Sequence, residues 1–297
     1  VSLARYQEGF NPAPVTRFLT SFVYLSGFLA GWMGRRISGW RRVRVTGLAI
    51  TPALLLTVLL TTKATVIFWV MLYVAAFLCC GGLAPRSVGS TSKPKSDILA
   101  LIKVAALTFF FALFLFIVQL SRYGGDLERE GSHVLEVLSV SAVGHHFAFR
   151  EWFENNGNWF PVTFGSRTFA GIFELFGMLV REPGIYGEEN IKVGNSETNV
   201  FSAIRSVTED FGIIFSLIMF FLAGFVSAVL ERRGNTKTNS QALFAVLVVW
   251  FMCTPITSLW AYNSLIFSSV IFVFIASRNA SFALLNDGEA GRGRPNT

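Results

Sequence analysis

Long stretches without charged residues dominate the chain and set the elements that it predicts. Uncharged apolar runs close to the length of a bilayer crossing occupy residues 18–34, 45–62, 64–85, 104–121, 211–230 and 238–277. The last run has about twice that length, and proline and polar residues interrupt it at Pro255–Asn263. The pattern therefore predicts seven transmembrane helices in an all-α, polytopic membrane protein.

The region 121–210 departs from this pattern and predicts a large loop of short interfacial helices. One helix ends at the turn signal Asn155-Asn156-Gly157. A second begins after Ser166, a suitable N-cap, and ends at Pro183. Their apolar faces carry Val134, Leu135, Leu138, Ala142, Phe149, Trp152 and Phe153 in the first helix, and Phe169, Ile172, Phe173, Phe176 and Leu179 in the second.

The stretch 198–212 runs directly into the fifth apolar run and predicts an amphipathic helix at the mouth of a membrane span. Thr198 is its expected N-cap. A helical wheel places Val200, Ile204, Val207 and Phe211 on one face, and Ser202, Arg205, Ser206 and Glu209 on the opposite face. The polar face predicts one half of a site.

Composition and charge placement agree with a membrane protein. Hydrophobic residues make up 53% of the chain and charged residues 14%, and the mean hydropathy is +0.54. A net charge of +7 could indicate a nucleic-acid partner, but the basic residues cluster in every second connection between apolar runs, which is the positive-inside pattern. These clusters are Arg35, Arg36, Arg41, Arg42 and Arg44; Arg86, Lys93 and Lys95; Arg232, Arg233 and Lys237; and Arg278, Arg292 and Arg294.

The positive-inside rule gives the predicted topology. The basic connections face the cytoplasm, so residues 1–15, Lys63, the region 121–210 and Ala261–Asn263 face outward by alternation. We therefore expect one membrane domain over residues 1–297. Its parts are four helices in 1–120, the outer loop 121–210, three helices in 211–281 and a cytoplasmic tail in 282–297.

The first residue, the cysteines and the known catalytic motifs give no indication of a particular chemistry. The chain begins with Val1 rather than Met, which we interpret as an internal cut in a longer protein, an N-terminally truncated fragment. Cys79, Cys80 and Cys253 lie within apolar runs and indicate neither a disulfide framework nor a metal site. No Gly-rich phosphate loop, Gly-x-Ser-x-Gly elbow or His-Glu-x-x-His motif occurs, and we expect no cofactor and no metal.

The outer region concentrates the titratable groups. It holds thirteen of the eighteen acidic residues and all three histidines. Arg205 and Glu209 stand at i, i+4, where a weak mutual pair is one interpretation and service to a ligand is the other. In the second case Arg205 neutralises a phosphate, while Glu209 or Asp210 accepts a proton from a hydroxyl.

Other polar residues leave a similar choice open. His145 and His146 are either polar residues at the interface or groups for acid–base catalysis. Arg5 and Lys63 are either interfacial anchors or contacts to a lipid-linked phosphate.

Several motifs of the outer region resemble, in order and spacing, the outer loop and following helix of the oligosaccharide repeat-unit polymerases, the Wzy-type O-antigen polymerase family. They are Phe-Gly-Ser-Arg-Thr-Phe at 164–169, Thr-Asn-Val-Phe-Ser at 198–202 and Glu-Asp-Phe-Gly at 209–212. Ser-Leu-Ala-Arg-Tyr at 2–6 and a basic residue in a tight outer turn at Lys63 are similar to that family as well. The likeness covers nearly the whole chain, and the family usually has more than seven helices.

This resemblance implies a glycosyltransferase that lengthens a surface polysaccharide, such as O-antigen, capsule or exopolysaccharide. A growing chain would pass from undecaprenyl pyrophosphate to the non-reducing end of a new lipid-linked repeat unit on the outer face of the bacterial plasma membrane, in which the protein would be a multi-pass component. Further expected partners are membrane lipids and the chain-length regulator and flippase proteins of the same pathway. The residues implied are Arg205, Arg167, Asn199, Lys63 and Arg5 as phosphate or glycan contacts, and Asp210, Glu209 or His146 as the base.

Three rival functions remain open from the sequence, and one of them is a non-enzymatic partner of the polysaccharide assembly machinery. A transporter or flippase for lipid-linked sugars is expected to carry charges at the bilayer midplane, whereas the apolar runs here carry none. An O-antigen ligase is the nearer rival and differs in its product, which is glycan attached to a lipid A core.

Overall fold

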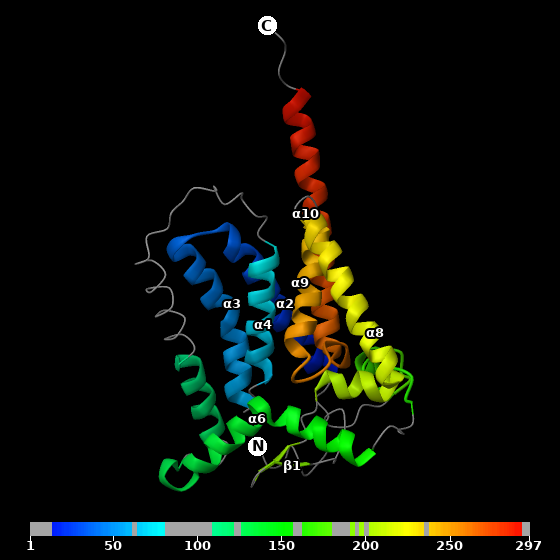
Figure 1. Cartoon of the computed structure of the whole chain (residues 1–297). Coiled ribbons are helices and arrows are strands. Elements are labelled where there is room, and N and C mark those ends of the chain that lie inside the picture. The colour runs from blue at the N-terminus through cyan, green and yellow to red at the C-terminus, as the bar shows by residue number, and fades with distance from the viewer. Residues whose placement is uncertain are drawn as a thin grey trace, which may run out of the picture.

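The computed structural model describes residues 14–60, 64–80, 109–121, 126–156, 162–179, 191–193, 196–198, 202–234 and 238–292. Most of these residues are helical (Figure 1). Three of the predicted site residues, Arg5, Lys63 and Asn199, lie outside the described residues.

Helices occupy the apolar runs that the sequence pattern predicts. Two of them, Gly39–Leu59 of α3 and Ala203–Gly234 of α8, are long and apolar enough to cross a membrane, and several shorter apolar helices accompany them in the described part. The break predicted at Pro255–Asn263 is present, since a turn and the short helix η1 separate α9 from α10. The bounds are α2 Pro14–Arg36, α3 Gly39–Leu60, α4 Ala64–Cys79, a helix at Phe109–Ser121, α8 Ala203–Gly234, α9 Thr238–Cys253, η1 Leu259–Ala261 and α10 Asn263–Arg292.

The main core lies between α2, α4, α9 and α10. Phe28 of α2 stacks on Phe272 of α10, with ring centroids 4.5 Å apart and planes 3° from parallel. Gly31 allows α2 and α4 to approach closely, because a Cβ at this position would lie 2.3 Å from the carbonyl oxygen of Tyr73. Aromatic stacking and small residues thus hold the helices together.

A polar contact ties α3 to the same core. The hydroxyl of Ser26 accepts a hydrogen bond from the indole Nε1 of Trp69 at 3.0 Å, and its proton is shared between the carbonyls of Val23 at 2.7 Å and Ala49 at 2.9 Å. Because Trp69 and Ala49 are buried or partly buried, the bonds with them fix α2, α3 and α4 relative to one another.

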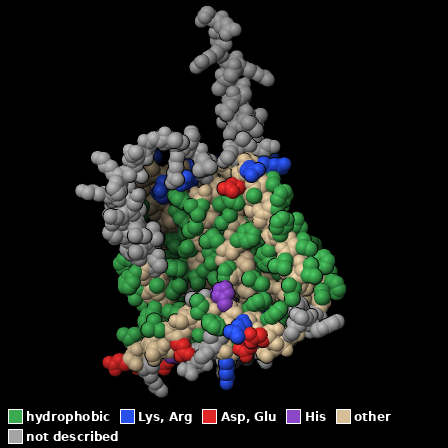
Figure 2. Space-filling model, viewed as in Figure 1, with side chains coloured by type: hydrophobic (Ala, Val, Ile, Leu, Met, Phe, Trp, Pro, Cys, Tyr) green, Lys and Arg blue, Asp and Glu red, His purple; other side chains and the backbone are tan. Residues whose placement is uncertain are grey.

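A layer of elements crosses one end of the helical bundle. The helix α6 (Leu127–Asn156) runs across this end, and the antiparallel strands β1 (Ile191–Val193) and β2 (Ser196–Thr198) lie against it (Figure 1). Figure 2 shows a broad apolar belt between this layer, where acidic side chains gather, and the opposite end, where Lys and Arg side chains gather. We call these the α6 end and the arginine end.

Several sequence predictions for local structure are wrong. The basic stretch after the first run is almost wholly helical, since α2 ends at Arg36 and α3 begins at Gly39, so that Arg41, Arg42 and Arg44 lie inside α3. Arginine has a high helix propensity, which favours helix at these positions although the N-terminus of α3 disfavours cations, and Arg35 and Arg36 suit the C-terminus of α2. The helix α10 continues to Arg292, so the described part of the predicted cytoplasmic tail is helical.

The second predicted interfacial helix is shorter than expected, while the first ends at Asn156 as predicted. Residues 164–169 form turns, and only Ala170–Leu175 form the helix α7. Ser166 is therefore not an N-cap, and its backbone N–H donates to the carbonyl of Thr163 at 3.2 Å. Positive φ angles at Phe164 and Gly165, 49° and 91°, prevent a helix from starting there.

The start of α8 also differs from the prediction. Thr198 pairs with Ile191 in the hairpin and is not an N-cap, because α8 begins only at Ala203. The helix then breaks at Gly212, whose φ of 75° and ψ of 169° lie in a region that only glycine adopts readily. The first part of α8 consequently lies across the α6 end, and the second part rises along the bundle (Figure 1).

Candidate functional site

The polar face of the first part of α8 points inward. Ser202, Arg205, Ser206 and Asp210 are buried. On the predicted apolar face Val207 is buried as well, and Ile204 is 37% exposed. The polar side of this part of α8 therefore belongs to the interior of the α6 end, and its apolar side is partly covered too.

Arg205 lies at the centre of this interior. Its side chain is 2% exposed, and its Nε lies 3.6 Å from Oε2 of Glu209, one turn later. Its guanidinium carbon lies 5.0 Å from the centroid of the Trp152 ring in α6, which is within the range of a cation–π contact. Arg205 therefore joins α8 to α6 as a buried cation.

Asp210 holds the 162–169 loop in place. Its carboxylate accepts hydrogen bonds from the hydroxyl of Thr163, from the backbone N–H of Arg167 at 3.1 Å and from the backbone N–H of Thr168 at 2.5 Å. The side chain is fully buried. A buried carboxylate that accepts several hydrogen bonds shapes the loop, which makes Asp210 a positioning residue in this geometry.

The break in α8 lets the same loop pair with the helix backbone. The backbone N–H of Thr163 donates to the carbonyl of Glu209 at 3.2 Å. The backbone N–H of Phe164 donates to the carbonyl of Asp210, also at 3.2 Å. In an unbroken helix these two carbonyls would bond to residues 213 and 214, so the break at Gly212 exchanges helix bonds for loop bonds. Glu209 and its neighbour are thus covered by residues from more than forty positions earlier.

The turn between α9 and α10 supports the site from the bundle side. The hydroxyl of Ser258 donates to the carbonyl of Thr168 at 2.9 Å, and the amide of Asn263 donates to Glu174 Oε2 at 2.9 Å. The N–H of Ala203 donates to the carbonyl of Thr254 at 2.8 Å, which caps the first turn of α8. The sequence break between α9 and α10 therefore serves as the platform of the site.

Two buried hydroxyls of the site are unsatisfied within the described residues. Ser202 Oγ belongs to the residue just before α8, and Thr168 Oγ1 belongs to the residue whose backbone N–H donates to Asp210. Buried hydroxyls normally have a partner, so these two mark hydrogen-bonding capacity available to a ligand or to water.

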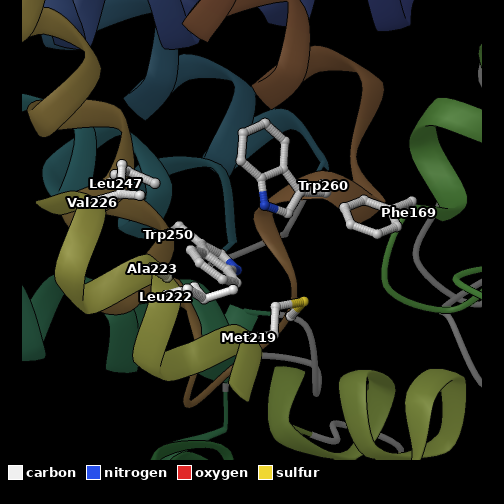
Figure 3. A pocket seen from close by; sticks show the side chains of 8 residues that line it. All are labelled: Phe169, Met219, Leu222, Ala223, Val226, Leu247, Trp250 and Trp260. Atoms are coloured by element: carbon white, nitrogen blue, oxygen red, sulfur yellow. The ribbon is translucent and has the colours of Figure 1, made fainter. Parts of the chain in front are cut away.

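An apolar groove of 330 Å³ opens between α8 and α9, beside the 162–169 loop. Figure 3 shows the lining side chains around one space, with Phe169 of the loop at one side and Val226 and Leu247 at the other. We call it the α8–α9 groove, and its lining residues are Phe169, Met219, Leu222, Ala223, Val226, Leu247, Trp250 and Trp260.

The adjacent histidines of α6 differ in environment. His145 is buried and His146 is exposed, with ring centroids 4.0 Å apart. Burial, and then the neighbouring His146, lower the pKa of His145, so its imidazole is neutral at pH 7. His145 lies on the same face of α6 as Ala148 and Trp152, three and seven residues later, and that face packs inward.

The structure places Glu209 against Arg205, which is the mutual pair that the sequence left open as one of two interpretations, and it joins Asp210 to Arg167 through the backbone N–H of Arg167. The exposed His146 makes its described ring contact with His145, away from this group. Sequence reasoning missed the role of Trp152, because a long-range cation–π contact leaves no local pattern. The sequence also did not predict that His145 is buried while the adjacent His146 is exposed.

Comparisons with models of protein families, with curated proteins and with solved structures found nothing that matches the chain. Within the part of the chain that the structure describes, no group of three His, Cys, Asp or Glu side chains lies close enough to hold a metal ion.

Proposed function

We propose that the protein is a multi-pass plasma-membrane glycosyltransferase that joins oligosaccharide repeat units carried on undecaprenyl pyrophosphate into a surface polysaccharide. In this proposal the α6 end faces outward and the arginine end faces the cytoplasm, in accordance with the positive-inside rule. The apolar belt in Figure 2 supports a position in a membrane, and the Lys and Arg side chains at the arginine end support that orientation.

The observation that carries the proposal is the position of the α8–α9 groove next to the polar site. Phe169 lines the groove, and its neighbour Thr168 donates to the carboxylate of Asp210. The lining is apolar, and the adjoining parts of α8 expose large apolar side chains such as Phe221 and Phe225. A ligand with a hydrocarbon tail and a charged head fits this arrangement, with its tail in the apolar groove and its head at the polar site.

Arg205 supplies the cation for the charged head. In the transfer step, an acceptor hydroxyl oxygen forms a bond to the anomeric carbon of the donor sugar, and the bond from that carbon to the pyrophosphate oxygen breaks. The leaving undecaprenyl pyrophosphate gains negative charge, which a buried guanidinium stabilises more strongly than an exposed one would.

Glu209 is the base in this mechanism. Its side chain is 14% exposed and lies one helical turn from Arg205, so a hydroxyl that reaches the arginine-bound phosphate also reaches this carboxylate. The proton of the acceptor hydroxyl passes to Glu209. Asp210, engaged by the loop, orients Arg167 and Thr168 and is not the base.

The test uses the purified full chain with a synthetic oligosaccharide on undecaprenyl pyrophosphate. The expected product is a lipid-linked ladder, with one undecaprenyl pyrophosphate released for each unit added. A parallel reaction contains lipid A core. Glycan attached to the core, or recovery of unchanged substrate in both reactions, would contradict the proposal.

A further inference from the structure

Arg42 is held rigidly at the arginine end. Its Nε and Nη2 donate to the carbonyl of Ile37 at 3.0 and 2.8 Å, and its guanidinium carbon lies 5.4 Å from the centroid of the Phe77 ring in α4. The stem packs over α2 at Gly34, where a Cβ would lie 3.8 Å from Arg42 Cγ. The guanidinium therefore has a defined place before any ligand binds.

Arg35 of α2 contacts the same ring. Its guanidinium carbon lies 5.5 Å from the centroid of Phe77. Two cations that share one ring repel each other, and the sequence contains no Asp or Glu between Glu8 and Asp97 to compensate them. In the described part of the chain, no ion pair within 4.0 Å joins either arginine to an acidic side chain. Within the described residues the two guanidiniums therefore have hydrogen-bonding capacity and positive charge to offer to an anion from outside the protein.

The surroundings of the pair indicate a lipid as the source of that anion. Arg36 and Arg44 lie over the rings of Trp32 and Trp40, at 4.6 and 5.5 Å, and Trp40 is 65% exposed. The neighbouring surface of the same two helices is apolar and exposed at Met33, Val43 and Leu48. Exposed tryptophan and arginine next to an apolar surface are typical of the headgroup level of a bilayer.

We propose that Arg35 and Arg42, held by Phe77, form a binding site for the phosphate of an anionic glycerophospholipid at the arginine end. The general excess of cations on a cytoplasmic face explains the number of arginines here, but not the fixing of two guanidiniums on one ring. The phosphate accepts hydrogen bonds from both guanidiniums, and the acyl chains lie along the apolar surface of α3. This site is independent of the transfer reaction at the α6 end.

The test titrates the detergent-purified full chain with phosphatidylglycerol, with phosphatidylcholine as the neutral comparison. Loss of one charged hydrogen-bonding partner is expected to weaken phosphatidylglycerol binding about tenfold in Arg35→Ala and in Arg42→Ala. Phe77→Leu keeps every charge and is expected to weaken binding several-fold. Arg42→Lys keeps the charge but loses the fork to Ile37 and is expected to behave like Arg42→Ala.

Arg41→Ala is the matched control, because Arg41 is exposed on the same helix and contacts no ring in the described structure. The affinity of the Arg41→Ala protein for phosphatidylglycerol is expected to change less than twofold. Equal loss in Arg41→Ala and Arg42→Ala would show a diffuse charge effect and overturn the proposal. Equal binding of phosphatidylcholine, or displacement of the lipid by millimolar inorganic phosphate, would overturn it too.

Discussion

The carboxylate of Asp210 accepts a hydrogen bond from the backbone N–H of Thr168 at 2.5 Å, although forty-two positions of sequence separate the two residues. This contact, with those from Thr163 and Arg167 to the same carboxylate, makes the 162–169 loop and the first part of α8 one unit. The proposed site and the groove beside it both depend on that unit.

Asp210→Ala is expected to destabilise the protein by about 3 kcal/mol, because it leaves buried donors without their charged acceptor. The loss is measured by thermal unfolding in detergent. Glu154→Gln is the control, because Glu154 is an exposed carboxylate that pairs with the exposed Arg150, and it is expected to unfold near the wild-type temperature. Equal stability of the two variants would contradict the positioning role of Asp210.

The break in α8 gives a second prediction. Gly212→Ala forces a side chain into a backbone conformation with φ of 75° and ψ of 169°, and is expected to cost about 1–3 kcal/mol. Gly224→Ala lies in the same helix without positive φ, and a Cβ there meets nothing within 4 Å, as at Gly212. The control is expected to be neutral or stabilising by roughly 0.5–1 kcal/mol, since alanine favours helix. Two variants of equal melting temperature would show that the break is not required.

The buried histidine predicts a pH effect. Burial lowers the pKa of His145, so the unfolded chain takes up this proton at a higher pH than the folded protein does. Stability from this residue is therefore complete above the unfolded pKa, about 6.5, and decreases as the pH falls below it. Melting temperatures between pH 7.5 and 5.5 are expected to fall less in His145→Asn than in the wild type. The opposite difference, or none, would count against a neutral buried imidazole.

Hydropathy was sufficient to predict where the helices lie, including the break between α9 and α10, because long apolar runs carry that information locally. It did not predict the hairpin, since three-residue strands are too short to show alternation. The break at Gly212 was hidden for a related reason, as a single glycine in an apolar run is compatible with a continuous helix.

The candidate site was predicted in part. The i, i+4 spacing placed Glu209 next to Arg205, and the structure has that pair. The sequence could not indicate that Asp210 would be used by a loop, or that Trp152 would cover Arg205, because both contacts join segments far apart in the chain. Such contacts depend on tertiary packing and leave no local pattern.

The α8–α9 groove gives a further prediction about substrate binding. Ala223→Phe fills the groove and is expected to raise the KM for a long-chain lipid-linked substrate about tenfold, with a smaller effect on a short-chain analogue. Ala228→Phe, an exposed position on the same helix outside the groove, is the control and is expected to leave the KM unchanged. An equal effect on long-chain and short-chain substrates would argue against a lipid tail in the groove.

The central claim is that the buried cation Arg205 stabilises the leaving pyrophosphate, and the most direct measurement is the initial rate of polymer formation by the purified Arg205→Ala protein. The rate is expected to fall roughly 10²–10³-fold, as for removal of one group that stabilises transition-state charge. Arg150→Ala, which removes an exposed arginine paired with Glu154, is expected to keep the wild-type rate. A folded Arg205→Ala protein that forms the lipid-linked ladder at the wild-type rate would contradict the claim.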